Sequence, residues 1–180
     1  METPIQILQR QRLLLQMEYY AEKETFRKQT EAVGMARKVK RGDAWYPLRV
    51  GKRFYNSMNQ LAIEVFRTGD DEIEHNFEFG KPVMFFKVSP AENTPGRLNL
   101  PGEKALKGKE KITYFGFTGT VSYVDGDRMV VTVPDSAPLL DLQSSEVPVG
   151  CQLSFDETSY KMMFGALDRV LKAFGNRLVY

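Results

Sequence analysis

The chain reads TGTVSYVDGDRMVVTV from Thr118 to Val133, and this stretch decides the fold class. Apolar residues at every second position favour two β-strands, and the Asp125-Gly126 pair between them favours a tight hairpin. Pairing Val121 with Val131 and Tyr123 with Met129 requires an odd-numbered loop, whereas Asp-Gly favours a loop of two residues. We give the apolar register precedence, which places Tyr123 on the same face as Val121.

The same alternation of apolar and polar residues recurs before and after this hairpin. It covers Tyr46 to Val50, Leu61 to Val65, Ile73 to Phe79, Phe115 to Phe117 and Cys151 to Phe155, whereas Val83 to Val88 is apolar on both faces. Six or seven short strands without helices between them predict an α+β, mainly β, fold whose antiparallel sheet closes into a small barrel over residues 44–155. Two long connections, 89–111 and 134–148, interrupt the strands, and loops of this length are usually functional or disordered.

A long amphipathic helix is predicted over residues 4–38. Pro4 suits the first turn of a helix, and the next proline is Pro47. An apolar stripe follows the helical period, and Arg12, Glu22 and Gln29 interrupt it. The stripe consists of Leu8, Leu15, Tyr19, Phe26 and Val33.

A second helix is predicted over residues 156–175. Asp156 suits the N-cap, and Gly175-Asn176 suits the C-terminal end. The apolar face contains Tyr160, Met163, Phe164, Leu167, Val170, Leu171 and Phe174. Because each terminal helix needs a partner for its apolar stripe, we expect the two to pair as an antiparallel stalk.

Composition limits the class of protein. The chain has 180 residues, a formal charge of +2 and one cysteine, Cys151. One cysteine excludes an internal disulfide and a multi-cysteine zinc site. The N-terminus lacks the pattern of a signal peptide, and no apolar run reaches the length of a membrane span, so we expect a cytoplasmic protein without a membrane partner.

The sequence offers no catalytic residue, no cofactor-binding residue and no metal ligand. Gly102 and Gly108-Lys109 resemble a phosphate-binding loop, but five residues separate the glycines and Glu110 follows the lysine. His75 on a strand would point away from Glu74 and Glu78, so we interpret it as a core or rim imidazole. Cys151 is interpreted as a small apolar strand residue.

Three clusters of basic residues lie beside aromatic residues. Cations follow phosphates and rings stack on bases in proteins that bind single-stranded nucleic acid. The alternative for each cluster is that the lysines and arginines are solvated and the rings belong to the core. The candidate binding residues are Arg37, Lys38, Lys40 and Arg41 before Trp45 and Tyr46; Lys52 and Arg53 before Phe54 and Tyr55; and Lys104, Lys107, Lys109 and Lys111 before Tyr114.

In this order the chain resembles the N-terminal stalk and barrel of superfamily 1 helicases similar to the nonsense-decay helicase and the immunoglobulin mu-binding helicase. The resemblance rests on residues 118–133, on 156–171 and on Phe79 to Val83. It implies that two stalk helices brace the barrel on a motor domain, with Asp156, Thr158 and Tyr160 in a structural role at the start of the second helix.

The resemblance also implies a function. The barrel of such helicases helps to hold a single strand of DNA or RNA, while ATP and magnesium bind motor domains whose motifs are absent from these 180 residues. We therefore expect this chain to be a non-enzymatic accessory domain of a larger ATP-dependent helicase, binding the strand weakly alone. The alternative is a stand-alone protein-interaction module that uses the exposed stalk, where Leu13, Leu14 and Met17 flank the main stripe.

Overall fold

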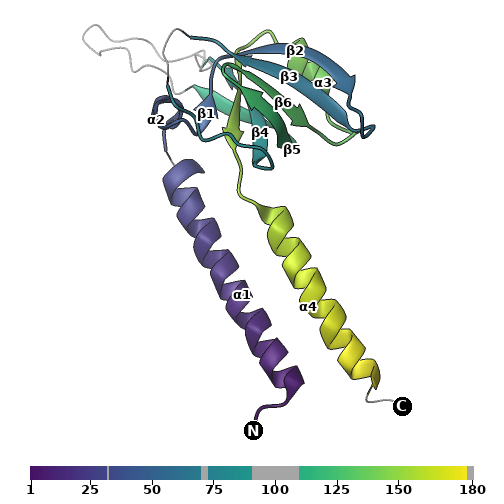
Figure 1. Ribbon diagram of the computed structural model, residues 1–180. Helices are drawn as coiled ribbons and strands as arrows, with labels where there is room; N and C mark the ends of the chain where they lie inside the picture. Colours follow the sequence, from purple (N-terminus) through teal and green to yellow (C-terminus); the bar gives the residue numbers. More distant parts are fainter. Residues whose placement is uncertain (32, 70–72, 91–109, 178–180) are drawn as a thin grey trace, which may run out of the picture. The chain divides into compact units, whose positions relative to one another are not determined.

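The computed structural model describes residues 1–31, 33–69, 73–90 and 110–177. The chain divides into two compact units, one made of Met1–Gly34 with Phe155–Tyr180 and one made of Met35–Ser154. The first unit is helical and the second contains the sheet (Figure 1).

The helical unit pairs α1 (Pro4–Phe26) with α4 (Glu157–Arg177), which lie side by side (Figure 1). Residues later in α1 contact residues earlier in α4: Arg12 bonds to Asp168, whereas Lys23 bonds to Glu157. The two helices are therefore antiparallel, as predicted for the stalk.

The predicted apolar stripe faces the partner helix. Leu8, Leu15, Tyr19 and Phe26 are half-buried, and the Tyr19 ring meets the rings of Phe155, Tyr160 and Phe164. No residue of α1 is fully buried, because a two-helix pair covers only one side of each helix.

A side-chain cap stabilises the N-terminus of each of the two helices. Thr3 and Gln6 form a reciprocal capping box at the start of α1, where Pro4 occupies the first turn. At the start of α4 the Asp156 carboxylate accepts a hydrogen bond from the Ser159 amide at 3.0 Å, which confirms the predicted N-cap. The predicted C-terminal end is wrong, because α4 continues through Gly175 to Arg177.

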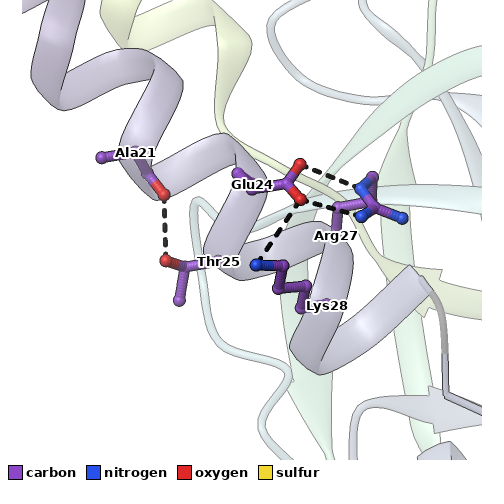
Figure 2. A network of polar contacts seen from close by, with 5 residues as sticks. All are labelled: Ala21, Glu24, Thr25, Arg27 and Lys28. Atoms are coloured by element: carbon purple, nitrogen blue, oxygen red, sulfur yellow. Dashed lines mark hydrogen bonds and ion pairs between the residues drawn. The ribbon is translucent and has the colours of Figure 1, made fainter.

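The predicted single helix over 4–38 is also wrong. α1 ends at Phe26, a π-helical turn, η1, covers Arg27–Glu31, and a separate α2 (Met35–Arg41) belongs to the sheet unit. Figure 2 shows the polar contacts where α1 ends: Glu24 accepts hydrogen bonds from Arg27 and lies 3.8 Å from the Lys28 ammonium, and Thr25 donates to Ala21 O. These bonds with Arg27 lower the pKa of Glu24.

Among the described residues, the sheet unit holds seven antiparallel strands in the order β1-β7-β4-β5-β6-β3-β2. The strands are β1 (Ala44–Trp45), β2 (Leu48–Tyr55), β3 (Leu61–Arg67), β4 (Pro82–Ser89), β5 (Lys111–Asp125), β6 (Arg128–Thr132) and β7 (Val149–Leu153). The core is built from their inward residues and from α3 (Leu139–Gln143), and includes Trp45, Ile63, Phe85, Val121, Met129 and Leu142. The predicted α+β class and antiparallel sheet are confirmed.

The predicted closed barrel is wrong. β1 and β2 end the strand order, and the sheet has no ladder between them. Only Tyr46 and Pro47 separate the two strands, so Trp45 and Leu48 lie within about 11 Å and the sheet is curled. Closure would require an unbroken ladder, and Pro47 has no N–H group to donate to one.

Two predicted segments differ from the structure. Residues 73–79 form no strand: Phe77 is buried in the core while Phe79 is 82% exposed in a turn. The predicted loop 134–148 contains α3, whose Leu139 and Leu142 are buried against the sheet.

The β5–β6 hairpin reconciles the two conflicting signals in its sequence. Val121 pairs with Val131 as predicted, and only Gly126 and Asp127 lie between the paired Asp125 and Arg128. A bulge between Val121 and Tyr123 absorbs the extra residue. The predicted pairing of Tyr123 with Met129 is wrong, and Tyr123 is 49% exposed while Val124 packs on the core.

Candidate nucleic-acid interface

The first basic cluster lies on α2 and is only partly accessible. Arg37 and Lys40 are exposed, and the Arg41 guanidinium lies 3.8 Å from the Asp43 carboxylate. Lys38 is 2% exposed, and its Nζ donates to Gln152 Oε1 at 3.2 Å. This burial argues against the predicted phosphate contact of Lys38 and gives it a structural part in the sheet unit.

The rings predicted to accompany this cluster belong to the core. Trp45 is 1% exposed and packs against His75 and Phe77. Tyr46 is half-buried beside Phe86, and burial raises its pKa. For these two rings the structure favours the alternative that they stabilise the fold.

The lysine cluster before Tyr114 lies mostly outside the described residues. Lys104, Lys107 and Lys109 belong to the undescribed range, while Lys111 is exposed at the start of β5. Tyr114 is 44% exposed, and its hydroxyl lies 3.5 Å from Gln152 Oε1, the atom that also accepts from Lys38. The buried side-chain amide of Gln152 therefore contacts residues of both α2 and the first part of β5.

The cluster of Lys52 and Arg53 lies on β2, the strand at one end of the sheet order, and is open to solvent. Lys52 and Arg53 are exposed, and the Lys52 ammonium lies 5.9 Å from the centre of the Phe54 ring. Within the described residues neither cation has a carboxylate within ion-pair distance. Beside them is a hollow of about 300 Å³, lined by Arg53, Phe54, Tyr55, Leu61, Asp135, Ala137 and Leu139.

Sequence reasoning missed several pairs of cation and ring, and two of them join neighbouring strands on the outer face of the sheet. The Arg49 guanidinium lies 3.9 Å from the centre of the Phe66 ring. Arg128 lies 5.5 Å from the Tyr123 ring and donates to Glu64 at 2.6 Å. The alternation in the sequence placed Arg49 on the opposite face of its strand from Leu48 and Val50. The rings that the two arginines meet belong to other strands, so these pairs could be known only once the strand order was known.

Cys151 and His75 both lie in the sheet unit, Cys151 fully buried and His75 half-buried. Burial raises the pKa of Cys151, which keeps its thiol protonated, and burial together with the Arg67 charge lowers the pKa of His75. Across the parts of the chain that the structure describes, no cluster of histidine, cysteine, aspartate or glutamate is arranged to hold a metal ion.

The stalk residues lie in the helical unit. Asp156 caps α4, and Thr158 is exposed in its first turn. Tyr160 is 7% exposed, and its hydroxyl donates to Glu22 at 2.6 Å, which raises the pKa of Tyr160 to about 12. Asp156 and Tyr160 therefore stabilise the helix pair.

No known protein family matches the chain, and no curated protein is significantly similar to it. Within the described ranges, none of the helices combines the length and apolar content needed to cross a bilayer.

Proposed function

We propose that this chain is a non-enzymatic accessory domain of an ATP-dependent superfamily 1 helicase and that it holds single-stranded DNA or RNA through β2. A motor domain that binds ATP and magnesium, and a cytoplasmic location, belong to this proposal and rest on the resemblance of the sequence. The observation that carries the binding role is the exposed Lys52 and Arg53 beside the rings of Phe54 and Tyr55.

Position and charge both support β2 as the binding strand. Exposed cations without carboxylate partners can neutralise phosphates without first breaking an ion pair. Tyr55 is 61% exposed, so one ring is available for a base, and stacking on a ring tolerates any base. The proposed contact is therefore electrostatic and independent of sequence.

The test is a salt titration of the 180-residue chain with a labelled single strand of about 16 nucleotides, the largest site size for a small β domain of this kind. If about four phosphates are neutralised, log affinity falls with log salt with a slope of about −3. The double variant Lys52→Gln with Arg53→Gln is expected to reduce the slope by about 1.4, since each phosphate on a single strand contributes about 0.7.

The matched control removes the same charge elsewhere. Lys161→Gln with Lys172→Gln changes two exposed lysines of α4 and should leave the slope at the wild-type value. Binding that does not depend on salt, or no binding by the wild-type chain, contradicts the proposal.

One observation favours a second candidate, the protein-interaction module. The side of α1 away from the stripe exposes Leu13, Leu14, Met17 and Tyr20, each more than half accessible. Sedimentation velocity distinguishes the two: self-association without strand binding supports the interaction module, and a monomer that binds the strand supports the helicase domain.

A further inference from the structure

One row of side chains crosses the outer face of the sheet over four neighbouring strands. Arg49 of β2 pairs with Phe66 of β3, Phe66 pairs with Arg128 of β6, and Arg128 pairs with Asp125 of β5. Figure 1 shows β2, β3 and β6 next to one another in the sheet. Because neighbouring strands are about 4.8 Å apart, the row is about 14 Å long.

Flat groups alternate along this row, which also includes Tyr123, two residues before Asp125 on the same face of β5. The Arg49 guanidinium covers the Phe66 ring at 3.9 Å, and the Arg128 guanidinium lies 5.5 Å from the Tyr123 ring. Arg128 is held in place by its 2.6 Å hydrogen bond to Glu64, whose side chain is only 13% exposed. Planar guanidinium groups and aromatic rings are the side chains on which unpaired bases stack.

The backbone presents Tyr123 to solvent. The bulge after Val121 turns Tyr123 outward and Val124 toward the core. On the inner face, Val65, Met129 and Val131 are fully buried. The row therefore stands on close-packed strands, which fixes the positions of its flat groups before any ligand arrives.

The charges of the row suit bases better than phosphates. Glu64 pairs with Arg128, and the Asp125 carboxylate lies 3.4 Å from the Tyr123 hydroxyl, so the two arginines of the row are balanced by two carboxylates. A surface that is nearly neutral and rich in rings suits uncharged base faces. Lys52 and Arg53 lie three and four residues beyond Arg49 on β2, and within the described residues neither has a carboxylate at ion-pair distance. Arg53 pairs with the buried Ile63, so its side chain leaves β2 on the core side and not on the face of the row.

We propose that this row is a base-stacking platform for single-stranded nucleic acid. One base stacks on the Arg49 guanidinium with Phe66 behind it, and a second stacks on Tyr123. Sheet faces in RNA-binding modules stack two or three bases in this way. The inference rests on the proposed function. It adds which surface binds the nucleic acid, that the nucleic acid runs across the strands of the sheet, and which residues stack on its bases.

The experiment uses the 180-residue chain and a single strand of about 16 nucleotides with 2-aminopurine at internal positions. Stacking on the platform is expected to change the fluorescence of the base analogue on binding. Tyr123→Ala should weaken affinity roughly 5- to 150-fold and abolish the change at one position, with the salt slope unchanged. Tyr20→Ala removes an exposed tyrosine of α1, 60% accessible against 49% for Tyr123, and is the control that should bind as the wild type does.

Arg49→Lys is the second variant, because it keeps the charge and removes the plane. We expect weaker affinity with the same salt slope, and circular dichroism verifies that each variant is folded. A folded Arg49→Lys or Tyr123→Ala chain with wild-type affinity and fluorescence overturns the platform while the salt-dependent binding of Lys52 and Arg53 still stands. A wild-type chain that binds no strand, including one whose sheet face instead binds protein, overturns the platform and the proposed function together.

Discussion

Gly150 of β7 lies opposite Phe86 of β4, with no room for a larger residue. A Cβ at position 150 would overlap the Cζ atom of the Phe86 ring, and that ring is fully buried. Glycine is therefore required here by the close approach of a neighbouring ring, with no demand on its backbone angles.

Gly150→Ala is predicted to lower the free energy of unfolding of the sheet unit by about 1 to 3 kcal/mol, the usual effect of overpacking. Urea unfolding followed by Trp45 fluorescence measures it, because Trp45 is the only tryptophan of the chain and lies in the sheet core. Adding Phe86→Leu should restore part of the loss. Gly165→Ala on α4, where only the flexible Arg169 side chain is near, should leave this signal unchanged.

His75 is the only histidine of the chain and packs against Trp45. Burial lowers its pKa below the ordinary value of 6.5, and the positive charge of Arg67 lowers it further, opposed by a hydrogen bond with the Phe77 backbone and by the carboxylate of Asp127. A depressed histidine pKa means that the unfolded chain binds the proton more readily than the folded one. The stability that neutral His75 contributes is therefore present above pH 6.5 and is lost as the pH falls toward its folded pKa.

The predicted outcome is a free energy of unfolding that falls as the pH is lowered through the range just below 6.5. His75→Phe keeps a ring against Trp45 and removes the titration, so the decline over that range should largely disappear. Trp45 fluorescence in urea at several pH values provides the measurement. An equal decline in both proteins would show that other groups cause it.

At the scale of elements, the polar residues that interrupt the α1 stripe are contacts to the partner helix. Arg12 donates to Asp168 at 2.7 Å and lies over the Phe164 ring, while Glu22 accepts from Tyr160. The hydrogen bond from Arg12 lowers the pKa of Asp168. A residue that breaks an apolar stripe can therefore mark the register of a helix pair.

Tyr160→Phe is predicted to lower the stability of the helix pair by about 1 to 2 kcal/mol, because it removes a hydrogen bond from a buried hydroxyl to a charged acceptor. Thermal unfolding followed by the helical circular dichroism signal measures the change. Tyr20→Phe, on the exposed side of α1, is the control and should unfold as the wild type does. Equal stability of the Tyr160→Phe and wild-type chains would mean that the Glu22 contact contributes nothing.

Helix existence was predictable, whereas some helix boundaries were not. The start of α4 could be predicted because Asp156 is a residue type that caps helices through its side chain, and the structure shows this cap. The break before α2 had one local signal, Gly34, which a continuous apolar period concealed. Residues 73–79 have the alternating pattern of a strand yet pair with no strand among the described residues. As a result Phe77 is buried, whereas Phe79 is exposed.

At the scale of the whole molecule, the chain forms two units whose boundary falls at Gly34 and Phe155 rather than at the predicted helix ends. The sheet unit contains its entire core, from Trp45 to Leu153. The helical unit is formed by both ends of the chain and has its own aromatic cluster around Tyr19.

The predicted consequence is that residues 35–154 fold alone. The shortened chain should show a cooperative urea transition by Trp45 fluorescence, with a buried-tryptophan emission spectrum like that of the full chain. A gradual transition, or an emission spectrum typical of exposed tryptophan, would show that the sheet depends on the terminal helices.

The sequence by itself determined most strands of the sheet, the apolar faces of the terminal helices and the helix cap at Asp156, because periodicity and capping are local properties of neighbouring residues. The tertiary structure alone decided that the sheet stays open at Pro47, that Lys38 is enclosed, and that Arg49 meets Phe66. These features depend on strand order and on which side chains from distant parts of the chain compete for the same space. A linear pattern of residues contains no information on either until the strands have paired.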